Sequence, residues 1–477
     1  MKLRRALSLG IALVSLLALP AALSAQDGES VEAPRRPAKS LLLGIGSNAP
    51  IEVLYTDLPG DPTADVPGLP GAHFSSFDRP YGSSVGSWVI TADTDLTTDQ
   101  DEILFSDDVV LVREGTPTPW NPGELFGLLD QQVAINAAGH VVFATNTNGP
   151  TTADEYAVVV PAGLPPEILA QEGQPMPFLA GATWGTTIES PVLSDGNVPG
   201  ISTDNIGGLP TTENEVIIAN GNLQAQEGVT VPTGQVGTEF WENFDVTDLW
   251  IDSAGTSWLV QGDLTGDTAL DDVVGVDGEI VIQEGSILAN STFAEPVDLN
   301  GIVGVHMARN GTWYARGNNA VSEQDWIYSD GAVLTKTGDP IFTGATEVWT
   351  DAEFADCFFL HIGDGLGNYV LGGVSNGPTP TNGLLVLNNA AEIVREGDAF
   401  DLDGNGQFDD DTYFNTFGND DGYLTDDGWF YFVATIRDGA GTPIGDGFFR
   451  ADVSCLIMPF TDGFESGDTS AWCLTVE

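Results

Sequence analysis

One stretch near the C-terminus has the residue types and spacing of a cation site. It reads Asp401-Leu402-Asp403-Gly404-Asn405-Gly406-Gln407-Phe408-Asp409-Asp410-Asp411. Oxygen donors stand at its first, third, fifth and ninth positions, and glycine stands at the sixth, as in a calcium-binding loop. A hard cation needs about six to eight oxygens around a tight turn. We therefore predict a structural calcium site formed by Asp401, Asp403, Asn405, Gln407, Asp409 and Asp411.

The match departs from the calcium pattern at one position. Thr412 stands twelfth, where a bidentate carboxylate is usual, so that Asp410 or Asp411 could take its place. An acidic surface loop without an ion is the alternative reading. Weaker candidates are the segment 263–272 and a cluster in the first repeat formed by Asp93, Asp95, Asp99 and Asp101.

Signals for catalysis are few. Residues 82–86 have the order of a serine-hydrolase elbow, but a strand is predicted after them, where that elbow requires a helix. The four histidines, His73, His140, His306 and His361, lie in different repeats, so we expect neither a zinc site nor a catalytic triad. We predict that the protein is not an enzyme.

These residues belong to an internal repeat. A pattern of glycine followed by a strand, clearest in the segment 136–143, recurs around Gly86, Gly139, Gly196, Gly255, Gly311, Gly367 and Gly428. The spacing stays close to 56 residues, which indicates one supersecondary unit copied seven times.

A second series keeps the same period. Strands that end in Glu-Gly place glutamates at Glu114, Glu172, Glu227, Glu284 and Glu396. A ring of such carboxylates could bind a metal or a cationic ligand. Because a residue copied in every unit more often stabilises its own turn, we expect a structural role. Acids that open the preceding strand (Glu102, Glu155, Glu215, Asp272 and Asp325) receive the same interpretation.

Each unit contains four short strands and almost no helix signal. Dipeptides that favour two-residue hairpins, such as Asp277-Gly278, separate the last two strands. Four antiparallel strands copied seven times predict an all-β, seven-bladed β-propeller over residues 41–453, because a single blade cannot bury both of its faces. The chain begins and ends in mid-repeat, so we expect the two half-repeats to close the ring. A string of small sandwiches would need longer units.

Composition and termini indicate an exported protein. Residues 1–25 have the basic start, apolar run and small-residue cleavage site of a signal peptide, and a flexible leader follows at 26–40. The formal net charge is −56, which disfavours nucleic acid and anionic lipid and favours cations, basic partners or a salty habitat. Later apolar runs are too short to span a membrane. We expect a secreted or cell-surface monomer.

Three cysteines allow one disulfide. Cys455 and Cys473 could close a loop in the C-terminal tail, residues 454–477, whereas Cys357 stands in an apolar strand and is expected to be inert core. The tail contains Asp462-Gly463-Phe464-Glu465-Ser466-Gly467-Asp468. This element resembles one near the C-terminus of other exported bacterial proteins, which implies attachment or sorting. An ordered cap is the alternative.

The repeats also resemble a known family. Asn136, Gly139 and Phe143 fit the Asn-x-x-Gly-x-x-Ala-Phe signature of bacterial secreted tandem-repeat proteins, with Val142 in place of alanine. The resemblance implies exported, propeller-like repeats and carries no catalytic residues. We therefore expect an extracellular, calcium-stabilised propeller that binds a glycan or protein. The alternative is a secreted calcium-dependent hydrolase or lyase that acts on a phosphate ester or polysaccharide.

Overall fold

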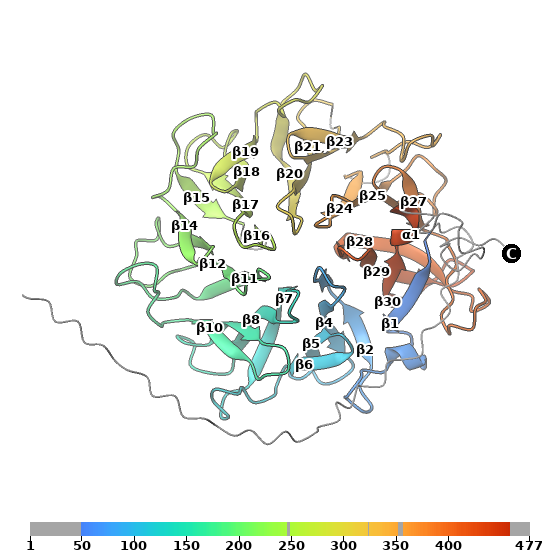
Figure 1. Cartoon of the computed structure of the whole chain (residues 1–477), viewed down its shortest axis with the longest axis horizontal. Helices are drawn as coiled ribbons and strands as arrows, with labels where there is room; N and C mark the ends of the chain where they lie inside the picture. Colours follow the sequence, from blue (N-terminus) through green and yellow to red (C-terminus); the bar gives the residue numbers. More distant parts are fainter. Residues whose placement is uncertain (1–48, 246–248, 323, 352–355, 458–477) are drawn as a thin grey trace, which may run out of the picture. The chain divides into compact units, whose positions relative to one another are not determined.

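The protein is a ring of seven antiparallel sheets. The computed structural model describes residues 49–245, 249–322, 324–351 and 356–457. The sheets follow one another around a central axis as the blades of a seven-bladed β-propeller, which confirms the predicted fold (Figure 1). The predicted signal peptide, the leader and most of the C-terminal tail lie outside the described residues.

Blades 1 to 3 occupy the first half of the chain. Blade 1 consists of β2 (Phe74–Phe77), β3 (Tyr81–Gly82), β4 (Trp88–Thr94), β5 (Glu102–Ser106) and β6 (Val109–Arg113). Blade 2 consists of β7 (Phe126–Ile135), β8 (Val141–Thr147), β9 (Glu155–Val160) and β10 (Glu167–Gln171). Blade 3 consists of β11 (Thr187–Leu193), β12 (Pro199–Asp204), β13 (Val216–Ala219) and β14 (Asn222–Gln226).

Blades 4 to 6 follow with the same order. Blade 4 consists of β15 (Trp241–Phe244), β16 (Trp250–Ile251), β17 (Trp258–Leu264), β18 (Asp272–Val276) and β19 (Glu279–Gln283). Blade 5 consists of β20 (Val297–Met307), β21 (Trp313–Asn319), β22 (Trp326–Ser329) and β23 (Ala332–Lys336). Blade 6 consists of β24 (Phe358–Gly363), β25 (Tyr369–Val374), β26 (Gly383–Leu387) and β27 (Ala391–Arg395).

Blade 7 joins the two ends of the chain. Its inner strands are β28 (Tyr413–Leu424), β29 (Trp429–Arg437) and β30 (Pro443–Asp452), and its outermost strand is β1 (Ile51–Thr56). In the β1–β30 register Val53 lies opposite Phe449, and Arg450 forms an ion pair with Glu52 (2.6 Å). The predicted closure of the ring by two half-repeats is therefore confirmed.

The strands of each blade run up and down, which gives the ring two different faces. We label the strands A (innermost) to D (outermost), and call the face with the A–B and C–D turns the turn face. The B–C loops and the connections from strand D to the next blade form the opposite, loop face. Besides the strands, the described residues contain a 3-10 turn (Pro62–Ala64) and α1 (Ser454–Ile457). Neither they nor any other described segment forms a helix able to cross a bilayer.

The turns explain the periodic glycines. Gly139 and five of its counterparts have positive φ angles at the A–B turns, a conformation that glycine adopts without strain. In the Gly196 copy the neighbouring Asn197 takes the left-handed conformation (φ 60°) instead, and Pro199 opens β12. In five blades the C–D turn has two successive residues with positive φ, as in Asp277-Gly278, which is the type I′ geometry of the two-residue hairpins that the sequence predicted.

Polar side chains cap the A–B turns. Asn136 Oδ1 accepts hydrogen bonds from the backbone N–H groups of Ala138 and His140 (both 3.0 Å). Asp252 and Asp364 accept hydrogen bonds in the same way in the A–B turns of blades 4 and 6, so aspartate can take the place of asparagine as the first residue of the signature. The signature is therefore a turn signature that fixes where strand A ends.

Candidate functional site

The predicted calcium loop, Asp401–Asp411, lies on the loop face. We call it the acidic loop, and it belongs to the connection between β27 of blade 6 and β28 of blade 7. Phe400 and Thr412 close its neck: the Phe400 N–H donates to the Thr412 carbonyl (3.3 Å), and the Thr412 hydroxyl donates to the Phe400 carbonyl (3.2 Å). Phe400 packs on Phe414 of the core (4.9 Å between ring centroids). Thr412 thus belongs to the neck, which explains why no carboxylate occupies the twelfth position.

Three carboxylates converge inside the acidic loop. Asp401, Asp403 and Asp410 each have an oxygen within 4.8 Å of the other two. Backbone N–H groups hold them in place: Gly406 donates to Asp401 (2.8 Å) and Leu402 donates to Asp410 (2.8 Å). Asp410 was considered in the sequence only as a substitute ligand.

The other predicted ligands are arranged differently. The Asn405 amide donates to Asp403 (3.1 Å), and its carbonyl oxygen accepts from the Gln407 N–H (2.7 Å). Asp409 lies 3.5 Å from the Asn405 amide nitrogen. Asp411 turns away and accepts from the Gly439 N–H (3.1 Å) in the β29–β30 connection.

The donor chemistry of the acidic loop fits calcium. Carboxylates are the ligands that Ca²⁺ prefers, and three of them with free lone pairs lie close enough to bind one ion. Asn405 could supply a further oxygen. The residues that would hold the ion are therefore Asp401, Asp403 and Asp410, with their orientation fixed by the backbone.

The weaker predicted clusters are dispersed in the part of the chain that the structure describes. Asp95 binds His73 through its N–H and its imidazole (both 2.8 Å), and Asp93 accepts from the Ser76 hydroxyl (2.9 Å). In the segment 263–272, Asp263 accepts from the Asn243 amide (2.8 Å). Within the described ranges, the acidic loop holds the one group of carboxylates close enough to share a metal ion.

The acids that open strand C join neighbouring blades. Glu102 accepts the Leu129 N–H of blade 2 (2.6 Å), and Glu215 accepts the Phe244 N–H of blade 4 (2.9 Å). Asp325 likewise accepts the Cys357 N–H of blade 6 (2.6 Å). Burial raises the pKa of Glu102 and of Glu215 to about 8 and that of Asp272 to about 7. These carboxyl groups have the structural role that we expected.

The repeated Glu-Gly glutamates also act structurally. Glu172, Glu227 and Glu396 accept N–H groups of the B–C loops of their own blades, from Asp154 (3.2 Å), Asn214 (3.0 Å) and Gly383 (3.0 Å). Glu284 accepts from Asn300 of the next blade (3.1 Å). Burial raises the pKa values of Glu114, Glu172, Glu227 and Glu284. These glutamates stabilise the ends of strand D.

The centre of the ring contains a buried polar cluster that the sequence did not indicate. Arg316 of β21 forms a bidentate ion pair with Asp420 of β28 (2.8 and 2.7 Å) and donates to the Phe359 carbonyl (2.7 Å). His361 lies beside this pair with 1% of its surface exposed, and neither of its ring nitrogens has a hydrogen-bond partner among the described residues. We call Arg316, Asp420, His306, His361 and Arg79 the central cluster.

Opposing effects set the charges in the central cluster. Burial raises the pKa of Asp420, but the charges of Arg316 and Arg79 outweigh it, so this carboxyl titrates below its usual value. Burial, followed by the charge of Arg316, lowers the pKa of His361 well below its usual value. Burial and Arg79 lower the pKa of His306 to about 3. Both imidazoles are therefore neutral at physiological pH.

Strand irregularities explain why the sequence did not reveal the cluster. The β28 register shifts between Phe417 and Gly422, and the extra residues bring Asp420 (φ 59°) inward. Similar shifts interrupt β7, β11 and β20. His306 and His361 belong to different repeats but lie on neighbouring A strands, and the His306 imidazole is 3.4 Å from the Gly363 carbonyl. The sequence contains no signal of this shift, because Phe414 is as far from Gly428 as Trp241 is from Gly255.

Large aromatic residues and one cysteine are part of the core. Trp184, Trp241 and Trp349 are at most 6% exposed and pack within the blades. Cys357 is free and buried, and burial raises its pKa to about 12, so it is inert as expected. Cys455 is disulfide-bonded, whereas Cys473 lies outside the described residues.

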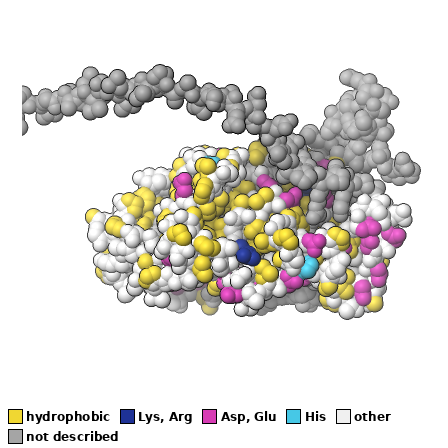
Figure 2. Space-filling view, turned by 90° about the horizontal axis from the view of Figure 1, so that it is seen from below, with side chains coloured by type: hydrophobic (Ala, Val, Ile, Leu, Met, Phe, Trp, Pro, Cys, Tyr) yellow, Lys and Arg dark blue, Asp and Glu magenta, His cyan; other side chains and the backbone are white. Residues whose placement is uncertain are grey.

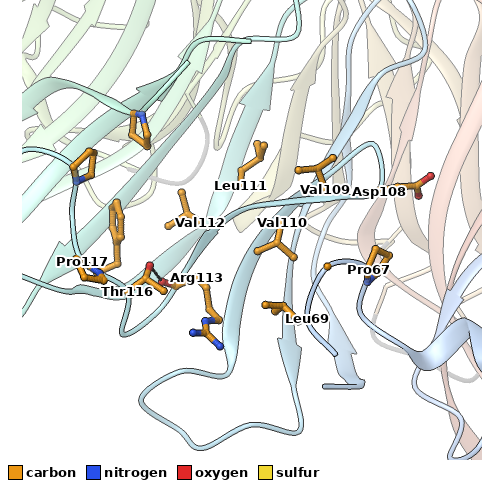
Figure 3. Close-up of a pocket in the computed structure, with 14 residues that line it drawn as sticks. Pro67, Leu69, Asp108, Val109, Val110, Leu111, Val112, Arg113, Thr116 and Pro117 are labelled. Atoms are coloured by element: carbon orange, nitrogen blue, oxygen red, sulfur yellow. Dashed lines mark hydrogen bonds between the residues drawn. The ribbon is translucent and has the colours of Figure 1, made fainter. Parts of the chain in front are cut away.

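The ring contains several cavities. One of about 570 Å³ lies at the periphery of the ring, along β6 of blade 1. Figure 3 shows it lined by Val110 and Leu69 beside the extended strand, with the Arg113 side chain at one end. At the turn face, a cavity of only about 50 Å³ lies between the A strands, next to Arg309 and Tyr423.

Among the charged side chains of the surface, acidic groups outnumber basic ones. On the face shown in Figure 2, acidic side chains are spread widely and gather at one end, whereas Lys and Arg are confined to a small patch. This agrees with the net charge of −56.

No protein family model and no curated protein matches the sequence. Several solved structures match the chain at low similarity. The neuraminidase-like protein N11 of A/flat-faced bat/Peru/033/2010 has 9% identity and a TM-score of 0.28, covering 65% of this chain and 84% of that one. Prolyl oligopeptidase B from Galerina marginata has 12% identity and a TM-score of 0.32, and the match spans 76% of this chain but only 56% of the peptidase.

A protein of unknown function from Dyadobacter fermentans is also similar. It has 12% identity and a TM-score of 0.29, with 87% of this chain and all of that chain covered. At these identities and scores the likenesses say nothing about activity or ligand. The class of protein, a seven-bladed β-propeller, rests on the sheet topology of the chain itself.

Proposed function

We propose that this protein is an exported, calcium-stabilised β-propeller that acts as an extracellular or cell-surface binding module and performs no catalysis. The signal peptide at 1–25 supports export. The three converging carboxylates of the acidic loop support calcium binding. The protein acts as a monomer that presents its loops to a glycan or protein.

The observation that carries this proposal is that the charged and titratable side chains of the central cluster are paired with one another or buried. A catalytic acid or base must reach the substrate within hydrogen-bond distance. Arg316 and Asp420 instead bind each other, with side-chain exposures of 6% and 26%, and His361 is buried beneath them. Groups held in this way stabilise the ring, which leaves the surface loops for recognition.

A secreted hydrolase or lyase is the second candidate, and one observation favours it. His361, Asp420 and Arg316 are a base, an acid and a cation that come from three blades and meet at one point with shifted pKa values. Such shifts are typical of active sites as well as of structural ion pairs. The two functions predict different fates for a bound ligand.

A binding experiment separates them. The mature chain is applied to immobilised extracellular glycans and proteins with calcium or with a chelator, next to the variant D401N/D403N/D410N. The proposal predicts retention that requires calcium and the three aspartates, and recovery of the ligand unchanged by mass spectrometry. Release of shortened ligand, abolished by His361→Gln, would instead establish the hydrolase or lyase.

A further inference from the structure

A cavity of about 270 Å³ opens on the loop face between blades 6 and 7. We call it the aromatic pocket. The described residues that line it and are used below are Asp356, Phe359, Glu396, Thr416, Phe417 and Asn419. The acidic loop begins five residues after Glu396, so the pocket and the candidate calcium site are built from the same connection.

Two phenylalanines form the apolar wall of the pocket. The rings of Phe359 (β24) and Phe417 (β28) lie nearly parallel, with centroids 6.2 Å apart and planes 17° apart. The positions equivalent to Phe417 in other blades are core: Phe77, Leu129 and Phe244 are 8%, 3% and 4% exposed. Phe417 is only half-buried. A position that is buried elsewhere in the ring therefore opens to solvent here.

Carboxylates complete the pocket. Glu396 accepts a hydrogen bond from the Gly383 N–H (3.0 Å), and a Cβ atom at position 383 would come within 2.5 Å of its carboxyl group, so a larger residue there would displace the carboxylate. Asp356 lies exposed at the rim. None of the described residues that line the pocket is basic. Arg316 donates to the Phe359 carbonyl and is neutralised by Asp420.

This combination selects the charge and the type of ligand. Aromatic faces and carboxylates both attract cations, and the apolar wall favours a cation that carries carbon. A bare metal ion does not fit, because the lining carboxylates do not form a group close enough to coordinate one, unlike those of the acidic loop. A neutral saccharide would leave the negative charges of Glu396 and Asp356 uncompensated, so the pocket favours a cation over a sugar.

We propose that the aromatic pocket binds a small organic cation with an alkylammonium or quaternary ammonium group. Phe359 and Phe417 contact the alkyl groups, and Glu396 and Asp356 compensate the charge. This inference rests on the proposed binding function and names the ligand class. The volume of the aromatic pocket corresponds to roughly nine water molecules at about 30 Å³ each, which suits a molecule of the size of choline.

Isothermal titration calorimetry with the mature chain in calcium tests the inference. The probes are choline and its uncharged carbon analogue 3,3-dimethyl-1-butanol, which has nearly the same shape. We expect choline to bind and the analogue to bind at least about tenfold more weakly, because the cation–π and charge interactions are lost. Equal affinities, or no choline binding, would overturn the inference.

Two pairs of variants locate the site. Phe417→Leu keeps the apolar volume but removes the ring, and should weaken choline binding by about 3- to 30-fold. Glu396→Gln keeps an acceptor for the Gly383 N–H. It should weaken the binding of choline but leave the binding of the analogue unchanged. Their controls are Phe240→Leu and Glu167→Gln, at exposed positions in other blades, which should bind as the wild type does.

Alternative outcomes remain distinguishable. If Phe417→Leu fails to fold, Phe359→Leu repeats the test from the neighbouring blade. If a neutral saccharide binds and these variants abolish its binding, the pocket is a glycan site and the proposal of a cationic ligand is wrong. If choline fails to bind but ligand retention still requires calcium and the acidic loop, the pocket inference falls while the proposed function stands.

Discussion

The ion pair of Arg316 and Asp420 is largely withdrawn from water, with Arg316 6% and Asp420 26% exposed. Each charge compensates the other, since an isolated buried charge is very costly. Phe359 supplies an additional acceptor for Arg316. The pair ties blade 5 to blade 7 across the ring.

We predict that Arg316→Met lowers the free energy of unfolding by about 3 to 5 kcal/mol, because it leaves Asp420 charged and unpaired. Adding Asp420→Asn should restore more than half of this loss, since asparagine tolerates the positive φ angle and carries no charge. Urea unfolding of the wild type and both variants measures the difference. A double variant no more stable than Arg316→Met would show that the pair is not the source of the stability.

At the scale of elements, carboxyl groups at the start of strand C link blades 1, 3 and 5 to the blade that follows each of them. Glu102 and Glu215 bind backbone N–H groups of the following A strand while buried among other acids. Their pKa values in the folded protein, about 8, lie above those of an unfolded chain, mainly because of burial. The stability that they contribute is therefore fully present below about pH 4.5 and is lost as the pH rises through about 8.

We predict that Glu215→Gln is more stable than the wild type at pH 9 by roughly 1 to 3 kcal/mol and shows a smaller fall in stability between pH 5 and pH 9. Glutamine keeps the oxygen that accepts the Phe244 N–H, so only the titration is removed. Chemical unfolding across this pH range provides the measurement. Glu167→Gln, on the exposed outer strand β10, is the control and should follow the wild type. Parallel pH profiles for Glu215→Gln and the wild type would contradict the assignment.

The closing strand β1 is the element on which the ring depends. Val53 and Tyr55 are 4% and 1% exposed, and the Tyr55 hydroxyl donates to Asp108 of blade 1. Fully burying one such side chain is worth about 1.5 to 3 kcal/mol. Without β1, strand β30 would also become an unpaired edge.

We predict that a chain starting at Asp57 loses about 3 to 6 kcal/mol of stability relative to a chain starting at Ala49, which retains β1. Thermal unfolding of the two chains is the measurement, and size-exclusion chromatography should reveal association of the shorter one through the exposed edge. Equal melting of the two chains would mean that the ring does not need its closing strand.

For the molecule as a whole, the local signals in the sequence were sufficient for the fold. The period between Gly86 and Gly428 and the Asp277-Gly278 type of turn depend on backbone conformation, which neighbouring residues determine. They predicted seven blades, four strands in each and closure by the two half-repeats. The repeated glutamates were also interpreted correctly, because a role copied in every blade is visible in every copy.

The sites depend on contacts between distant residues, and these were predicted less well. The acidic loop was recognised, but Asp410 converges with Asp401 and Asp403, while Asp411 binds Gly439 of another connection. Arg316, His361 and Asp420 come from three blades, and only the shifted register of β28 brings Asp420 to the others. The spacing of these residues along the chain does not predict that their side chains come together.

The most direct test of the account is the melting temperature of the mature chain in calcium and in chelator, measured for the wild type and for D401N/D403N/D410N. An ion that binds only the folded ring adds about 2.7 kcal/mol at a concentration of about 100 times its Kd, which for a domain of this size is a rise of roughly 2 to 5 °C. We predict this rise for the wild type and its loss in the triple variant. Identical wild-type melting curves in calcium and chelator, or a rise that persists without the three aspartates, would contradict a calcium-stabilised propeller.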